Sequence, residues 1–359
     1  MSALFSPIDV GPLVIRNRVW LSPMCQYSCM ERDGMPAAWH LIHLGGFAAG
    51  GFGLVMTEAT AVSAEGRISD RDTGIWTDEQ ASAWAPIVEA IRAQGATAGI
   101  QLAHAGRKAS TYAPWGAPAK GTIPAADGGW STVAPSDVAF EGYVAPVALD
   151  AEGIDKVVAD FVAAAVRACT VGFEAIEIHA AHGYLLHQFL SPLSNRRDDE
   201  YGGSLENRAR LLLRIVREVR AVIGARALLV RLSGTDWAEE GEDRWDAEAC
   251  AQVARAATEA GADGFDISSG GILAHPSIPL GPGYQVPFAE TVRAAVDVPV
   301  SAVGLITDAE QAERIVADGR ADAVMLGREA LRNPQLANAW SVSLAAGTPG
   351  VPGQYERAY

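Results

Sequence analysis

The chain of 359 residues is 49% hydrophobic and 20% charged, enough apolar material for a large core, which excludes a disordered chain. Acidic residues outnumber basic ones by 43 to 28, and the net charge of −15 argues against nucleic acid as a partner because it repels phosphate backbones. No leader peptide is visible at the start and no apolar run is long enough to span a bilayer, so we expect a cytoplasmic protein with no membrane partner.

The first expected element is a hairpin lid over residues 4–15, with its turn at Gly11-Pro12, covering one end of the fold. Eight strands are predicted after it, over 18–22, 53–59, 98–102, 175–178, 227–232, 264–267, 300–303 and 323–326. The helices predicted between them cover 40–49, 77–94, 154–171, 204–223, 247–260, 287–296 and 308–317.

This alternation indicates an α/β protein in which parallel strands close into one TIM (β/α)8 barrel, a single domain over residues 1–359. A doubly wound open sheet is the alternative, weakened because no G-x-G-x-x-G follows the first strand. A long insertion after strand three, over 112–147, is rich in Gly and Pro and carries Trp115 and Trp130. Such excursions are often functional.

One stretch dominates the chemistry: Glu177-Ile-His-Ala-Ala-His-Gly-Tyr184. A strand delivers His179 at its carboxyl end, His182 lies three positions on, and Gly183 is free to take a tight turn before Tyr184. Two imidazoles one helical turn apart can point at the same small atom, and a phenol beside them can give or take a proton. The pattern favours a site that grips an electron-rich oxygen and protonates a neighbouring carbon. Structural histidines and a zinc site are the alternatives, but zinc-binding helices usually pair histidines at a four-residue spacing and add a third ligand, so we expect no metal.

The active site of such a barrel lies at the carboxyl ends of its strands. The candidate site residues lie at or just after those ends: Cys25, Tyr27, Ala59, Gln101, Lys108, His179, His182, Tyr184, Arg231, Gly304, Gly327 and Arg328. The last three fit a phosphate site at the ends of strands seven and eight, although either glycine alone could be a simple turn. Arg231 needs an anionic partner or a strong acceptor. Cys25 fits a reactive or redox-tuning thiol and a small buried apolar residue equally well.

Several long motifs, in one order along the whole chain, resemble the Old Yellow Enzyme family of flavin-dependent ene-reductases, specifically the bacterial thermophilic-like class that includes xenobiotic reductases. These motifs are Ser22-Pro-Met-Cys-Gln-Tyr27, Gln101-Leu-Ala-His-Ala-Gly-Arg-Lys108, His179-Ala-Ala-His-Gly-Tyr184, Ser191-Pro-Leu-Ser-Asn195, Glu200-Tyr-Gly-Gly-Ser-Leu-Glu-Asn-Arg208, Gly281-Pro-Gly-Tyr-Gln-Val-Pro-Phe288 and Gln354-Tyr-Glu-Arg357.

The resemblance implies FMN held non-covalently across the barrel mouth, with NADPH or NADH as the reductant. The cofactor-binding residues it implies are Ser22, Pro23, Met24, Cys25, Ala59, Gln101 and Arg231 at the ring, Lys108 adding positive charge nearby, and Gly304, Gly327 and Arg328 at the phosphate. Arg231 would stabilise the reduced, anionic flavin.

The implied reaction reduces the activated C=C bond of α,β-unsaturated carbonyl or nitro compounds by hydride transfer from flavin N5. His179 and His182 would hydrogen-bond the activating oxygen, Tyr184 would protonate the substrate, and Tyr27 and Cys25 would line the substrate site. The alternatives are a flavin reductase acting chiefly on nitroesters or nitroaromatics, or a non-catalytic flavin-binding barrel.

The resemblance also implies a homodimer or homotetramer. In this class a C-terminal tail, here 346–359, reaches a neighbouring subunit, and Arg357 would enter that subunit's substrate site. A disordered tail is the alternative. The chain ends in Ala358-Tyr359 where relatives commonly have Gly-Trp, which weakens the expected packing of the tail.

Overall fold

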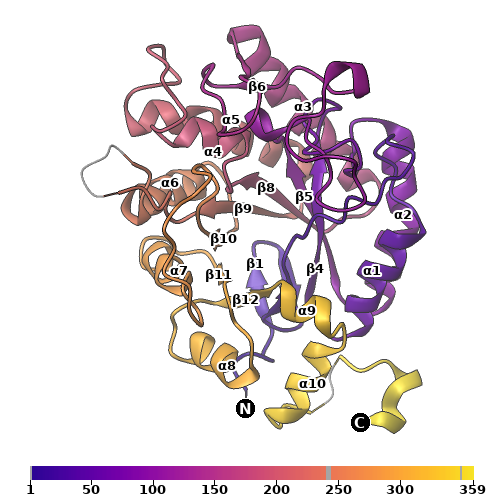
Figure 1. Ribbon diagram of the computed structural model, residues 1–359. Helices are drawn as coiled ribbons and strands as arrows, with labels where there is room; N and C mark the ends of the chain where they lie inside the picture. Colours follow the sequence, from indigo (N-terminus) through magenta and orange to yellow (C-terminus); the bar gives the residue numbers. More distant parts are fainter. Residues whose placement is uncertain (1, 240–243, 348–349) are drawn as a thin grey trace.

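A computed structural model describes residues 2–239, 244–347 and 350–359. Eight parallel strands close into a barrel in the order β10-β11-β12-β3-β4-β5-β8-β9 (Figure 1). Their bounds are β3 Val19–Leu21, β4 Leu54–Ala61, β5 Thr97–Ala103, β8 Ala175–Ala180, β9 Ala227–Ser233, β10 Gly264–Ser268, β11 Val300–Ala302 and β12 Ala323–Leu326. The predicted barrel is therefore confirmed, and the open-sheet alternative is wrong.

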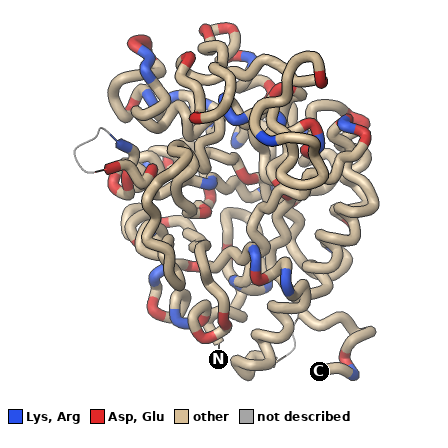
Figure 2. Tube along the Cα trace, in the orientation of Figure 1, with Lys and Arg blue, Asp and Glu red and all other residues tan. Residues whose placement is uncertain are grey.

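Helices surround the barrel because each strand is buried on both faces and needs an outer cover. The outer helices are α1 Ala38–Ala49, α2 Asp78–Ala93, α3 Ala151–Thr170, α5 Leu205–Ile223, α6 Ala247–Glu259, α7 Val286–Arg293 and α8 Ala309–Ala317. Local signals fix their starts: Thr77 and Gln80 form a capping box on α2, and Ser204 caps α5. Basic and acidic residues are scattered over these helices and their loops (Figure 2).

Three short helices were not predicted: α4 Leu185–Leu190, α9 Arg328–Arg332 and α10 Leu336–Ser343. Two of them have only five or six residues, too few to show a helical period in the sequence. Strand β8 also runs two residues beyond its predicted end because His179 and Ala180 pair with Arg231 and Leu232 of β9.

The amino end of the barrel is closed by the predicted hairpin, β1 Ile8–Val10 and β2 Leu13–Ile15. Ile8, Val10 and Ile15 pack inside the barrel in a hydrophobic cluster of their own, with side chains that include Trp20 and Met325. A second, larger apolar cluster fills the space between the barrel and the helices. The open end of the barrel is therefore the carboxyl end.

Strand β5 is followed by the 3-10 helix η1 Gly106–Lys108. The insertion then contains η2 Ala125–Asp127 and a two-stranded pair, β6 Val133–Ala134 and β7 Val147–Ala148. Trp130 of the insertion donates a hydrogen bond from its indole to the carbonyl of Glu65, at 2.8 Å. The chain ends in η3 Gly353–Ala358, which is exposed and projects from the body of the protein (Figure 1). In the described residues, no helix is long and apolar enough to cross a membrane.

Candidate active site

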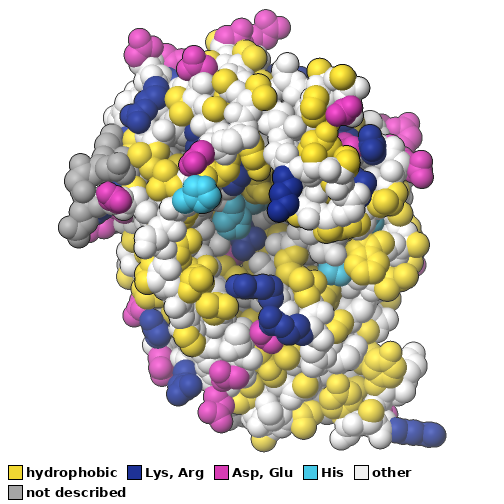
Figure 3. Space-filling model, in the orientation of Figure 1, with side chains coloured by type: hydrophobic (Ala, Val, Ile, Leu, Met, Phe, Trp, Pro, Cys, Tyr) yellow, Lys and Arg dark blue, Asp and Glu magenta, His cyan; other side chains and the backbone are white. Residues whose placement is uncertain are grey.

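Three side chains predicted to act together meet at the carboxyl end of β8. The ring centroid of His179 lies 5.1 Å from that of His182 and 5.1 Å from that of Tyr184, with both pairs nearly perpendicular. The space-filling view shows histidine, Lys and Arg side chains gathered at a hollow on this face (Figure 3). The assumption that the two histidines are a helical turn apart is wrong, because His179 lies in β8 and His182 lies in the turn after it.

That turn depends on two residues in the left-handed region of backbone space, His182 at φ 59° and Gly183 at φ 70°. A Cβ atom at Gly183 would lie 2.0 Å from the carbonyl oxygen of Gly271, so only glycine fits there. A histidine at positive φ is uncommon and marks a conformation that its surroundings impose. Here the surroundings are hydrogen bonds, from the His182 amide to Ser233 Oγ at 3.0 Å and between His182 Nε2 and Ser268 Oγ at 2.8 Å.

The protonation states follow from burial. Burial, with Arg231 nearby, lowers the pKa of His179 and of His182 well below the usual 6.5, so both rings are neutral at pH 7. His179 Nδ1 accepts a hydrogen bond from the amide of Ala181 at 3.2 Å, which leaves its ring proton on Nε2. Burial raises the pKa of Tyr184, which therefore carries its phenolic proton. The site thus offers neutral N–H donors and a protonated phenol.

Lys108 lies next to His182 and Tyr184. Its ammonium donates to the carbonyls of His182, at 2.8 Å, and Gly271, at 3.0 Å, and lies 5.0 Å from the centroid of the Tyr184 ring. Phe140 from the insertion covers the same ammonium at 4.8 Å, and burial lowers the pKa of Lys108 to about 8. Lys108 therefore ties the turn at His182-Gly183 to the loop after β10 and places a positive charge beside the phenol.

The loop after β3 forms another side of the mouth. Cys25 lies beside Ala59 and hydrogen-bonds Tyr27, and burial raises the pKa of the Cys25 thiol, which therefore stays protonated. Glu58, which the sequence did not single out, holds this loop: its carboxylate accepts from the amide of Gln26 at 2.8 Å and pairs with His40 at 3.1 Å. Nothing local in the sequence marks Glu58, because His40 and Gln26 are distant along the chain.

Inside the barrel, below the mouth, Gln101, Glu177, Arg231 and Asp266 form what we call the interior polar cluster. Arg231 Nε contacts Asp266 Oδ2 at 2.7 Å, and Gln101 Nε2 donates to Glu177 Oε1 at 2.7 Å. The anionic partner that Arg231 was expected to need is thus supplied by the protein itself. Ser22 also accepts from Arg231, at 3.2 Å, and joins the loop after β3 to the cluster.

The predicted phosphate residues line one pocket of ≈ 180 Å³ at the ends of β11 and β12. Gly304 has φ 116°, and a Cβ atom there would lie 2.7 Å from Gln285 Nε2. Gly327 and Arg328 lie across the pocket, and the thioether of Met24 is 3.6 Å from where a Gly327 Cβ would lie. Arg332 also lines it and was not predicted. Glu329 lines the pocket too and forms an ion pair with Arg332, so Arg328 is the guanidinium that, beside tightly packed glycine backbone, fits a phosphate.

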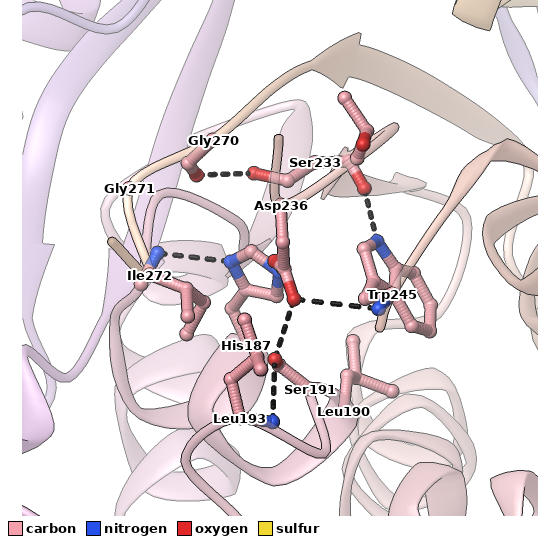
Figure 4. Close-up of polar contacts among 12 residues, drawn as sticks. His187, Leu190, Ser191, Leu193, Ser233, Asp236, Trp245, Gly270, Gly271 and Ile272 are labelled. Carbon is pink, nitrogen blue, oxygen red and sulfur yellow. Dashed lines mark hydrogen bonds and ion pairs between the residues drawn. The ribbon is translucent and has the colours of Figure 1, made fainter. Parts of the chain in front are cut away.

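A buried network behind the turn at His182-Gly183 was also missed (Figure 4). His187 Nδ1 accepts from the Gly183 amide at 2.9 Å, and His187 Nε2 reaches Asp236 Oδ1 at 3.0 Å. The hydroxyl of Ser191 donates to the other oxygen of Asp236 at 2.5 Å. Both Asp236 and His187 have no exposed surface. Ser191 lies in a motif that the sequence singled out, but its acceptor is 45 residues away.

Arg357 is the one predicted site residue that the structure leaves apart from the others. It lies in η3, exposed, on the tail that projects away from the barrel (Figure 1). A role at a substrate site would therefore have to be played in a second copy of the chain. Among the described residues, no group of three or more His, Cys, Asp or Glu side chains is placed to hold a metal ion.

Comparison with known proteins agrees with this geometry. The NADH:flavin oxidoreductase / NADH oxidase family matches residues 3–345. An NADPH dehydrogenase of Bacillus subtilis (strain 168) is 45% identical over 357 residues, 99% of each chain. Morphinone reductase superposes with a TM-score of 0.79 at 31% identity over 95% of this chain and 90% of its own. An old yellow enzyme homologue from Zymomonas mobilis gives 0.76 at 28% identity, over 96% and 93%.

These matches span nearly the whole chain and confirm the resemblance drawn from its motifs. The fold and the relatives agree on an NAD(P)H-dependent oxidoreductase that uses a flavin. The chain belongs to the NADH:flavin oxidoreductase / NADH oxidase family, the family of Old Yellow Enzyme.

Proposed function

We propose that this protein is an FMN-dependent ene-reductase that uses NADPH or NADH to reduce the activated C=C bond of α,β-unsaturated carbonyl or nitro compounds. The observation that carries the proposal is the trio at the mouth: two neutral imidazoles and a protonated phenol with ring centroids about 5 Å apart. When bound, FMN would supply the two-electron chemistry between nicotinamide and substrate.

The residues of the candidate site fit both the phosphate and the ring of FMN. Arg328 and the backbone at Gly304 and Gly327 would hold the phosphate, and Arg332 lines the same pocket as an ion pair with Glu329. Ser22, Pro23, Met24, Cys25, Ala59, Gln101 and Arg231 would line the ring, with Lys108 close by. Because Arg231 is permanently charged and buried, it would favour a ring that carries negative charge.

The chain's own residues would handle the substrate as follows. His179 and His182 would donate hydrogen bonds to the carbonyl or nitro oxygen, where negative charge develops during reduction. Neutral rings suit that task, because a neutral imidazole can donate a hydrogen bond to the oxygen without transferring its proton. Tyr184 keeps its proton at pH 7 and would deliver it to the carbon next to the activating group. Tyr27 and Cys25 would pack against the rest of the substrate.

We further propose that the tail completes the site of a second copy in a homodimer or homotetramer. Support comes from η3, which is exposed and extends away from its own barrel with Arg357 near its end. Sedimentation should then show an oligomer. Mixing a Tyr184→Phe chain with an Arg357→Ala chain should restore part of the activity that each homo-oligomer lacks.

The colour of the purified protein tests the main proposal. We expect a yellow preparation that NADPH bleaches without air and that cyclohexenone restores, with the saturated ketone as product. Retention of the bleached state after addition of cyclohexenone, or a colourless protein that does not take up FMN, would contradict it.

A further inference from the structure

The interior polar cluster contains two carboxyl groups but one cation. Glu177 and Asp266 are fully buried, and Arg231 is 4% exposed. The groups that face the cluster come from five elements: Gln101 of β5, Glu177 and His179 of β8, Arg231 of β9, Asp266 of β10 and Ser301 of β11, with Ser22 reaching in after β3. His179 is neutral, so one positive charge faces two acids.

The two carboxyl groups, of Asp266 and Glu177, have different partners. Asp266 contacts Arg231 Nε at 2.7 Å and accepts from Ser301 Oγ at 3.2 Å. Glu177 receives one hydrogen bond, from the amide of Gln101 to Oε1, while its Oε2 atom is buried without a hydrogen-bond partner among the described residues. A buried carboxylate with an uncompensated oxygen is costly, whereas the protonated acid is far less so. Burial, with Asp266 nearby, raises the pKa of Glu177 to about 8.

We propose that Glu177 is held as a neutral carboxylic acid, and that this proton leaves the interior polar cluster without net charge beneath the place where the cofactor ring gains negative charge. This inference rests on the proposed function, since a ring that takes up electrons is needed for the proton to matter. The charges of Arg231 and Asp266 cancel, and a neutral Glu177 adds nothing that would repel an anion.

The effect of the Glu177 proton on reduction of the ring should be seen at high pH, where this proton is lost. There Glu177 ionises, the cluster becomes negative, and an anionic ring above it is disfavoured. Reduction of the ring by NADPH then has to be accompanied by uptake of one proton from water, which converts the Glu177 carboxylate back to the acid. The electrons come from the nicotinamide and the additional proton comes from solvent, so the step balances.

The test is the midpoint potential of the bound flavin in the holoenzyme between about pH 6 and pH 10. One additional proton per two electrons changes the equilibrium tenfold per pH unit, which is about 30 mV per pH unit for a two-electron couple. Wild type should show this additional slope above about pH 8, the region set by the raised pKa. Glu177→Gln mimics the neutral acid, so it should match wild type at pH 7 and lack the additional slope.

Asp266→Asn is the matched contrast. It removes an ionised partner of Arg231, so it should raise the potential at every pH rather than only at high pH. If the midpoint potential of Glu177→Gln differs from that of wild type by the same amount at all pH values, Glu177 is ionised throughout and the proposal is overturned. The proposal is also overturned if the wild-type potential shows no additional slope above about pH 8.

Infrared spectra of the wild-type protein give a second readout that does not depend on the variant folding. Burial also raises the pKa of Asp72, to about 7, so the band has to be one that an Asp72→Asn variant retains. Such a protonated-carboxyl stretching band at pH 7 that disappears above about pH 8 supports the assignment. Absence of the band at pH 7 overturns it. Failure of the proposed function looks different, because a protein that binds no FMN has no flavin potential to measure while the infrared titration of Glu177 can still be made.

Discussion

Asp236→Asn tests whether the network behind the turn at His182-Gly183 is held by a charge. Asp236 is fully buried. One of its carboxylate oxygens accepts hydrogen bonds from Ser191 Oγ at 2.5 Å and from the Trp245 amide at 3.4 Å, and the other lies 3.0 Å from His187 Nε2. Asparagine keeps the shape but removes the charge. The carboxylate's contacts with Ser191 and with His187 both lose the help of the charge, and at about 1 kcal/mol lost for each, the free energy of unfolding should fall by about 2 kcal/mol. Because His187 also accepts from the Gly183 amide, the turn that carries Tyr184 should loosen.

Urea unfolding at one fixed FMN concentration measures the first effect, since bound ligand changes apparent stability by mass action. Titration with a phenol measures the second, and a loss of about 1 kcal/mol in binding corresponds to roughly fivefold weaker affinity. Asp308→Asn is the control with the same chemical change: Asp308 caps α8 through an oxygen that asparagine also has, so about 0.5 kcal/mol or less should be lost. If Asp236→Asn is as stable as this control, the network is not charge-assisted and the argument fails.

The other predictions concern the mouth of the barrel. Tyr184→Phe should slow olefin reduction by about 10²–10⁴-fold in stopped-flow experiments while flavin reduction by NADPH stays nearly intact, and equal loss in both half-reactions would contradict the proton-donor role. Replacing His179 and His182 together by Asn should weaken phenol binding by about 10-fold or more, and unchanged affinity would refute the oxygen-gripping assignment. In the unfolded chain these two histidines take up protons near pH 6.5, whereas in the fold burial keeps them neutral, so the free energy of unfolding should fall as pH drops below 6.5. Between about pH 7 and pH 5.5 the double variant should therefore lose about 2 kcal/mol less than wild type in urea unfolding, and an equal loss would count against the lowered pKa values. Arg328→Ala should weaken FMN binding by about 10-fold or more but leave riboflavin binding unchanged, whereas equal weakening of both would place Arg328 away from the phosphate.

Most of the barrel could be predicted from the sequence because its signals are local. Runs such as Ala227–Ser233 are mostly apolar and flanked by capped helices, and eight repeats of strand and helix leave few alternatives to closure. Boundaries were less accurate, since the last two residues of β8 are strand only because β9 pairs with them.

The candidate site could likewise be predicted only where its residues lie in local motifs. The motifs contained His179, His182 and Tyr184, and the structure brings the three rings together. Their acidic partners could not be predicted, because each lies on another element. Asp266 reaches Arg231 across neighbouring strands, and Asp236 meets Ser191 from a different loop. Such long-range pairs leave no periodic signal, so a single sequence does not reveal them.

The hairpin at the amino end has a kinetic consequence. Ile8, Val10 and Ile15 fill that end of the barrel with packed side chains, which closes it to small molecules. In the proposed reaction, nicotinamide and olefin would therefore both enter at the carboxyl end, where two flat molecules could not occupy the same face of a ring at once. Turnover by the proposed function would then be a double displacement, with parallel lines in a reciprocal plot and inhibition by each reactant at high concentration.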